Sequence, residues 1–285
     1  MTAQQIYRSE AGRAELMAWY EKGLAHWSIP YRSRQVATRH GRTAVLDCGA
    51  EGRPPVVLLH GSASTAVLWA AEANDLAPTH RVLAVDIPGE PGRSDTHRPP
   101  WRDHSFAEWL ADVLDGLGLR RAAVVGLSQG GWVALRFATV FPERVTHLAL
   151  LGPGGLVHPR LSFVLKAIAL SSLGKRGVRA MVAAVTAPRP LHPEVVAYME
   201  AIHAHFRPRV ERLPLLRDEE LLRLTMPVLL VAGGRDAFFD ARKSCARLER
   251  LVPHARIEVL VDEGHALVEQ GPRLLEFLTG TATPV

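Results

Sequence analysis

Residues 124–131 read Val-Val-Gly-Leu-Ser-Gln-Gly-Gly, an apolar strand that runs into a Gly-x-Ser-x-Gly turn and then into a helix. A serine on so sharp a turn adopts a strained backbone, which costs about 1–3 kcal/mol and is tolerated where function requires it. Gly126 and Gly130 lack a Cβ, so the strand and the helix can approach each other closely. We therefore expect the hydroxyl of Ser128 to stand clear of a sheet edge, at a helix N-terminus.

Short apolar segments alternate with helical segments on both sides of this turn. Their residues are apolar on both faces, as in the central strands of a parallel sheet that helices cover. A pair of shorter extended segments before them, 35–38 and 43–46, is joined through His40-Gly41 and predicts a hairpin. The order strand, helix, strand predicts an α/β fold with a doubly wound, mostly parallel sheet. The predicted central strands are 56–59, 81–85, 122–125, 146–151, 228–231 and 257–261.

The rhythm of strands and helices divides the chain into three parts. Residues 1–30 have a helical composition and predict an N-terminal helix packed on the outside of the domain. Residues 31–155 and 226–285 carry the strand–helix alternation and form the core. Residues 156–225 contain no strand pattern and several prolines, and they predict an inserted helical cap.

Composition limits the class of protein. The chain has 285 residues, a formal net charge of +5 and a sequence pI of about 9.6, but its basic residues are scattered and match no nucleic-acid-binding module. Two cysteines, Cys48 and Cys245, lie far apart, as expected of free thiols in a reducing compartment. We find no signal-peptide profile and no apolar run long enough for a membrane span, and we expect a cytoplasmic protein. The sequence does not indicate its oligomeric state.

A serine nucleophile needs a general base, usually histidine, and an acid that orients that base. Of thirteen histidines, His265 is the best placed, because it follows the predicted strand 257–261 and is expected to open the last helix. Asp236 lies just past the strand 228–231, so both side chains should reach the same sheet edge. Asp240 and Asp262 are the rival acids, at a helix start and beside the histidine.

The transition state also needs backbone N–H donors for its oxyanion. We assign this role to Gln129, which follows the serine, and to Ser62 in the loop after the strand 56–59. His60, at the end of that strand, is expected to brace the loop rather than act as a base. Asp86 opens a Pro- and Gly-rich loop and is expected to be structural. That loop lacks the lysine of a P-loop and the spacing of a dinucleotide site.

Five motifs now stand in one order: His60-Gly61, Asp86-x-Pro-Gly-x-x-Gly-x-Ser, Gly126-x-Ser128-x-Gly130, Gly-Gly-Arg-Asp236 and Gly264-His265. Together they resemble the α/β-hydrolase superfamily, in particular capped serine hydrolases similar to bacterial carboxylesterases. The resemblance covers about residues 35–280. It implies an eight-stranded sheet with one antiparallel strand near its start, Ser128 as nucleophile, His265 as base, Asp236 as its partner, and no cofactor. The sequence itself has no H-E-x-x-H motif or Cys/His cluster that would indicate a metal.

The resemblance also frames the expected substrate. The loop 89–92 reads Gly-Glu-Pro-Gly where relatives often have a plain Gly-x-Gly, so we expect a different rim. The cap block 161–170 is apolar, with Lys166 within it. It suggests either a wall of the substrate pocket or the core of the cap. As a pocket wall it would suit a small to medium, partly apolar ester. We expect Trp69, Leu165 and Phe238 to line the pocket. The alternatives are a thioesterase, a lactonase or a carbon–carbon bond hydrolase with the same triad and, further off, a lyase, a cofactor-free peroxidase or a non-catalytic receptor.

Overall fold

A computed structural model of the chain describes residues 6–188 and 192–280. Eight strands form one sheet in the order β1-β2-β4-β3-β5-β6-β7-β8. β2 is antiparallel to both of its neighbours, and the remaining pairs, from β4 to β8, are parallel. The strands are β1 (Tyr31–Thr38), β2 (Gly41–Cys48), β3 (Pro55–Leu59), β4 (Arg81–Val85), β5 (Ala122–Leu127), β6 (Val145–Leu151), β7 (Val228–Gly233) and β8 (Arg256–Leu260).

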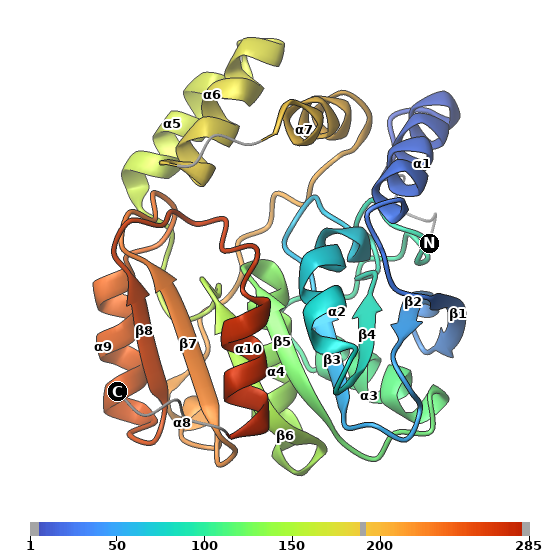
Figure 1. Cartoon of the computed structure of the whole chain (residues 1–285). Coiled ribbons are helices and arrows are strands. Elements are labelled where there is room, and N and C mark those ends of the chain that lie inside the picture. The colour runs from blue at the N-terminus through green and yellow to red at the C-terminus, as the bar shows by residue number, and fades with distance from the viewer. Residues whose placement is uncertain (1–5, 189–191, 281–285) are drawn as a thin grey trace.

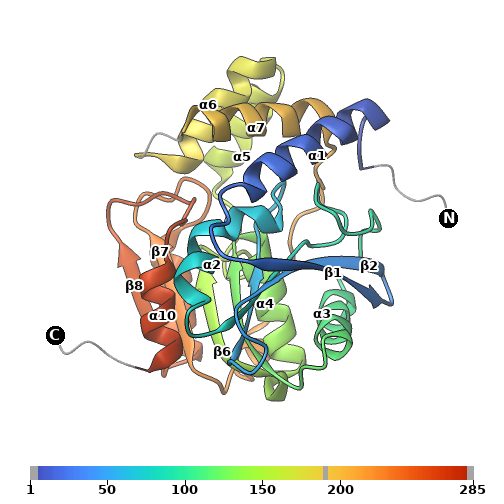
Figure 2. The same cartoon turned by 45° about the vertical axis from the view of Figure 1, so that its right-hand side comes forward.

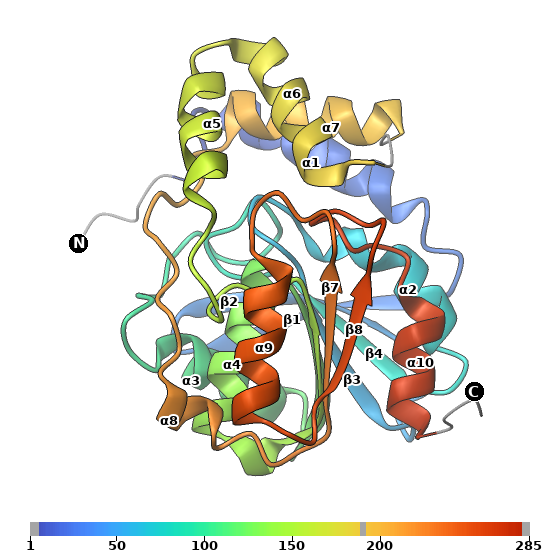
Figure 3. The same ribbon diagram turned by 90° about the vertical axis from the view of Figure 1, so that its left-hand side faces the viewer.

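Helices cover both faces of this sheet, which confirms the doubly wound arrangement (Figures 1 and 3). One apolar core lies between the sheet and α3, α4, α8 and α9, and a second lies between the sheet and α2 and α10. The helices of the core are α2 (Ala70–Leu76), α3 (Ser105–Gly116), α4 (Gln129–Val140), α8 (Asp218–Leu221), α9 (Ala241–Leu251) and α10 (Gly271–Thr279), with short 3-10 turns η1 (Ala66–Trp69) and η2 (Pro142–Arg144). The strands β4, β5 and β7 are buried along their whole length, as their continuous apolar sequences predict.

The cap stands above the carboxyl ends of the strands (Figure 1). It consists of α5 (Leu161–Ser171), α6 (Gly174–Thr186) and α7 (Pro193–His205). The helical cap ends earlier than the predicted residue 225, because the chain after His205 runs back down the core. There Leu216, Leu221 and Leu224 are buried in the core cluster.

The N-terminal helix α1 (Glu10–Leu24) lies beside the cap helix α7, in the views of both Figure 1 and Figure 2. A third apolar cluster joins them, in which Leu16 of α1 packs with Ile202 and with Phe206, which follows α7. The lower end of α1 contributes Tyr20 and Leu24 to the second core. The N-terminal helix predicted within residues 1–30 spans Glu10–Leu24 in the structure, and it connects the core to the cap. No helix in the described ranges is both long and apolar enough to cross a membrane.

Candidate active site

Ser128 lies between the end of β5 and the first residue of α4. Its φ is +52° and its ψ is −109°, in a region that non-glycine residues rarely adopt. A Cβ on Gly126 would come within 2.3 Å of the carbonyl oxygen of Gly130, so this turn can close only with glycine at that position. The sequence-predicted turn thus places the serine hydroxyl at the N-terminus of α4, above the sheet edge.

The structure brings Ser128, His265 and Asp236 into one chain of hydrogen bonds. His265 Nε2 lies 2.8 Å from Ser128 Oγ, and His265 Nδ1 lies 2.8 Å from Asp236 Oδ2. A carboxylate only accepts, so Nδ1 carries the ring proton of the neutral histidine and Nε2 is free to accept from the serine hydroxyl. The imidazole and the carboxylate are both buried, which strengthens these hydrogen bonds relative to water.

Two sets of backbone contacts fix the acid and the base. Oδ1 of Asp236 accepts from the N–H groups of Phe238 and Phe239, at 2.6 and 3.0 Å, so its other oxygen faces His265. The N–H of His265 donates to the carbonyl oxygen of Val185 in the last turn of α6, at 3.0 Å. Helices leave their final carbonyls without intrahelical partners, and here the cap supplies one of these to the histidine loop.

His265 does not open the last helix, which corrects the sequence prediction. Residues 266–270 are not helical, and α10 begins at Gly271 with Pro272 in its first turn. The N–H of Ala266 also points to the carbonyl of Val185, at 3.3 Å, and Glu269 has a φ of +59°. These contacts draw the segment out of a helical path, and proline, which is favoured at the first helical position, starts the helix afterwards.

The loop after β3 runs against the serine. A Cβ on Gly61 would lie 3.6 Å from the Cβ of Ser128, so the loop that carries Ser62 passes next to the serine. Gln129 is the first residue of α4, where backbone N–H groups have no intrahelical acceptor. The two predicted oxyanion donors therefore belong to segments that meet at Ser128.

His60 and Asp86 form their hydrogen bonds with residues other than the serine. The ring of His60 is fully buried; its Nε2 accepts from the N–H of Ile87 at 3.0 Å, and its Nδ1 lies 2.8 Å from the carbonyl of Gly61. Burial lowers the pKa of His60, which favours the neutral ring that these contacts require. Asp86 accepts from the Tyr20 hydroxyl at 3.0 Å and from the N–H of Ala66 at 2.7 Å, and so joins α1 to η1.

The three predicted pocket residues have different surroundings in the structure. Phe238 stacks on the imidazole of His265, with ring centroids 5.2 Å apart, and Phe163 from the cap packs on Phe238 at 4.5 Å. Trp69 is instead buried in the second core, and Leu165 is 58% exposed on α5. The face of α5 that turns toward the site presents Phe163, which the apolar sequence of this helix did not distinguish from its neighbours.

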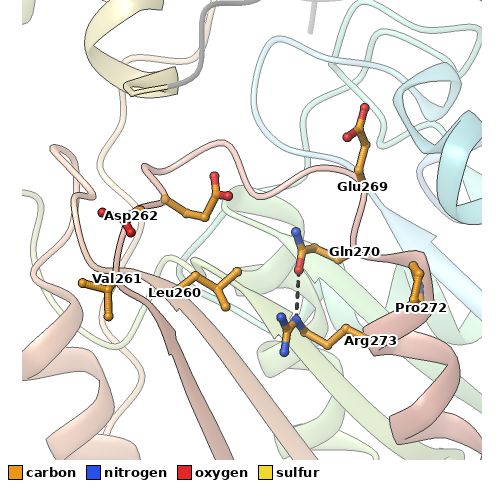
Figure 4. A pocket seen from close by; sticks show the side chains of 8 residues that line it. Leu260, Val261, Asp262, Glu269, Gln270, Pro272 and Arg273 are labelled. Atoms are coloured by element: carbon orange, nitrogen blue, oxygen red, sulfur yellow. Dashed lines mark hydrogen bonds between the residues drawn. The ribbon is translucent and has the colours of Figure 1, made fainter.

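A surface hollow of about 360 Å³ lies outside the serine site, below the loop that joins β8 to α10 (Figure 4). Gln270 accepts a hydrogen bond from Arg273 at one side of it, and the side chain of Glu269 points away from this pair. Its lining includes neither Ser128 nor His265. This hollow therefore borders the segments on both sides of His265 without reaching the serine.

The sequence and the fold of this chain are similar to those of known proteins. Residues 54–185 match the family model described as the alpha/beta hydrolase fold. The chain is 30% identical to the Bacillus subtilis carboxylesterase YbfK over 274 residues, which cover 92% of each chain. The chain belongs to the α/β-hydrolase family.

Two further relatives come from the same organism. An uncharacterised carboxylesterase of Bacillus subtilis, nap, is 30% identical over 261 residues, covering 89% of this chain and 87% of the relative. The crystal structure of the naproxen esterase (carboxylesterase NP) of Bacillus subtilis superimposes with a TM-score of 0.86 at 28% identity, covering 96% of this chain and 99% of that one. The predicted superfamily and fold class are confirmed, and this α/β-hydrolase is an enzyme of the hydrolase class.

Proposed function

We propose that this α/β-hydrolase cleaves carboxylic esters of small to medium, partly apolar substrates through an acyl-enzyme on Ser128. The observation that carries the proposal is the pair of 2.8 Å contacts from Asp236 through His265 to Ser128 Oγ. Similarity to two Bacillus subtilis carboxylesterases, over 89% and 92% of this chain, supports an ester as the scissile group. The free cysteines Cys48 and Cys245 are the basis for proposing the cytoplasm as its compartment.

The chemistry follows from the hydrogen-bond directions. His265 Nε2 removes the proton of Ser128 Oγ as the oxygen attacks the ester carbonyl, and the N–H groups of Ser62 and Gln129 stabilise the oxyanion. The protonated His265, steadied by Asp236, then gives that proton to the departing alkoxide, and the alcohol leaves. A water molecule, deprotonated by His265, attacks the acyl-enzyme, and the collapse of the second tetrahedral intermediate returns the proton to Ser128 and releases the acid.

The surroundings of the histidine favour an apolar group near the bond that breaks. The ring of Phe238 lies next to His265, and Phe163 of the cap packs on Phe238, so the first ring is partly buried and the second is buried. Arg160, just before α5, donates from its backbone N–H to the carbonyl of Phe238 at 2.8 Å, which fixes this aromatic wall to the start of the cap. Ester specificity would therefore change with the cap.

The test is a panel of 4-nitrophenyl esters of increasing acyl length, with thioester and lactone arms, together with labelling by a fluorophosphonate. We expect ester hydrolysis, labelling at Ser128, and a loss of about 10⁴-fold or more in kcat for Ser128→Ala. Ser244→Ala removes another buried serine and should keep its activity. Hydrolysis of thioesters or lactones alone would replace the ester assignment, and a protein that neither turns over any arm nor reacts with the fluorophosphonate would refute it.

A further inference from the structure

Glu90 is a buried carboxylate beside the serine that the reaction above does not use. It lies in the loop after β4 and is 3% exposed. Its Oε1 accepts from the side-chain Nε2 of Gln129 at 2.9 Å, and its Oε2 accepts from the backbone N–H of Ala63 at 2.7 Å. Each carboxylate oxygen thus binds a different segment of the site.

These two segments are the ones that carry the oxyanion donors. Ala63 directly follows Ser62 and has a φ of +53°, which a non-glycine residue keeps only where its surroundings hold it. Gln129 directly follows Ser128 and begins α4. A single carboxylate therefore connects the loop after β3 to the helix after β5, next to the two N–H groups that must point at one oxygen atom.

The loop that carries Glu90 is itself fixed. The N–H of Gly92 donates to the carbonyl of Glu90 at 2.8 Å, and the N–H of Gly89 donates to the carbonyl of Asp95 at 3.1 Å. The contact between Ile87 and the ring of His60, described above, ties the start of this loop to the end of β3. The carboxylate is thus presented from a rigid support, as a positioning role requires.

The effect of burial on Glu90 is opposed by its hydrogen bonds more than by nearby positive charges. Burial raises the pKa of Glu90, while its hydrogen bonds from Gln129 and Ala63 and the more distant charges of Arg98 and Arg209 lower it. Besides burial, the charge of Glu90 also contributes to the raised pKa of the hydroxyl groups of Tyr7 and Tyr198. Two hydrogen bonds to the oxygens of one carboxyl group are directional, so they set the positions of their two donors relative to each other.

We propose that Glu90 is a positioning residue of the oxyanion hole, which holds the segments of Ser62 and Gln129 at the separation that lets both N–H groups reach the oxyanion. This inference rests on the proposed esterase function. It predicts a selective loss of transition-state stabilisation when both acceptors are removed. Removing a whole oxyanion donor costs about 10²–10³-fold in kcat, and a displaced pair of donors should lose a part of that.

Two substitutions separate the hydrogen bonds from the charge. Glu90→Met fills similar space and accepts neither bond, and we expect kcat to fall at least about thirtyfold with KM changed less than about threefold. Glu90→Gln can accept from Ala63 and donate to the amide oxygen of Gln129 once that amide turns over, so kcat should stay within about threefold. Glu72→Met is the matched control, because Glu72 is also a buried glutamate that accepts a backbone N–H, from Gln270 at 3.1 Å. It should lose thermal stability and keep kcat.

A second measurement is the affinity for a trifluoromethyl ketone or a boronic acid. Both compounds form tetrahedral adducts on Ser128, so their binding also depends on the oxyanion donors. For Glu90→Met this affinity should fall by the same factor as kcat/KM. If Glu90→Met does not fold, Gln129→Met removes one half of the bridge and should lower kcat about tenfold by the same reasoning. A folded Glu90→Met enzyme with unchanged kcat, or an equal loss in Glu90→Gln, overturns the inference. Failure of the wild type to hydrolyse any ester would instead overturn the proposed function.

Discussion

Replacement of Asp236 by asparagine should invert the proton arrangement of His265 without disturbing its position. Oδ1 of Asp236 accepts from the N–H groups of Phe238 and Phe239. An asparagine oxygen can keep both bonds, so its NH₂ group must take the place of Oδ2, 2.8 Å from His265 Nδ1. The opposite orientation would leave two buried N–H groups without an acceptor, at about 1–3 kcal/mol each.

An NH₂ group facing Nδ1 requires that nitrogen to accept, which moves the ring proton to Nε2. Nε2 then donates toward Ser128 Oγ and can no longer remove its proton. Inversions of this kind lower kcat by about 10⁴-fold, or about 5.5 kcal/mol of transition-state stabilisation. We therefore expect Asp236→Asn to retain about 10⁻⁴ of the wild-type kcat and its thermal stability to stay close to that of the wild type.

The assay is steady-state hydrolysis of a 4-nitrophenyl ester, with the rate of fluorophosphonate labelling as a second measure. Both rates should rise with pH in the variant, since hydroxide replaces the missing base. Asp240→Asn is the matched control: Asp240 caps α9 by accepting from the N–H of Lys243 at 3.2 Å, and asparagine caps equally well. Activity of Asp236→Asn above one-tenth of the wild type, or an inactive Asp240→Asn, would refute the assignment of the acid.

Three further predictions concern the buried carboxyl group of Glu72, the glycine of the serine turn and the thiol of Cys48. Burial raises the pKa of Glu72, so the native state keeps a proton that the unfolded state has lost, and the contribution of Glu72 to stability falls as pH rises above about 4.5. Glu72→Gln should remove this contribution, so the difference in stability between the variant and the wild type should change with pH in denaturation curves from pH 4 to 8. A difference that is constant over this range would contradict the prediction. Gly126→Ala should lower the free energy of unfolding by about 2–3 kcal/mol, because the new Cβ would clash with the carbonyl oxygen of Gly130. Gly52→Ala is the control: open space surrounds this position, so the loss should stay under about 0.5 kcal/mol. Burial raises the pKa of Cys48 to about 12, so a thiol reagent at pH 8 should modify it only after unfolding and should reach the partly exposed Cys245 first.

The sequence predicted those parts of the molecule that depend on local pattern. Continuous apolar runs identified the central strands, and the residues just past their ends identified Ser128, Asp236 and His265, which the structure joins by two hydrogen bonds. Parallel strands end at one edge, so side chains that follow different strands were bound to meet there. The prediction therefore depends on the direction of the strands and not on the strength of any contact.

The errors concern segments whose conformation depends on distant partners. Residues 266–270 have a helical composition, but the carbonyl of Val185, about eighty positions away, takes the N–H groups that would begin the helix. Glu90 was noted only as a departure in a glycine-rich loop, since its partners Ala63 and Gln129 lie 27 and 39 residues away. The phase of α5, which buries Phe163 and exposes Leu165, depends on the docking of the cap and could not be derived from a helix with apolar residues around most of its circumference.

The carbonyl of Val185 also limits how caps can be exchanged between enzymes of this fold. A foreign cap could bring new aromatic walls and so a new substrate preference, yet its last helix would have to end with a free carbonyl at the same height above the sheet. A graft one residue longer or shorter would rotate that carbonyl by about 100° around the helix axis and release the N–H of His265. Chimeras designed to change specificity should therefore be joined after this residue, with the register of α6 preserved.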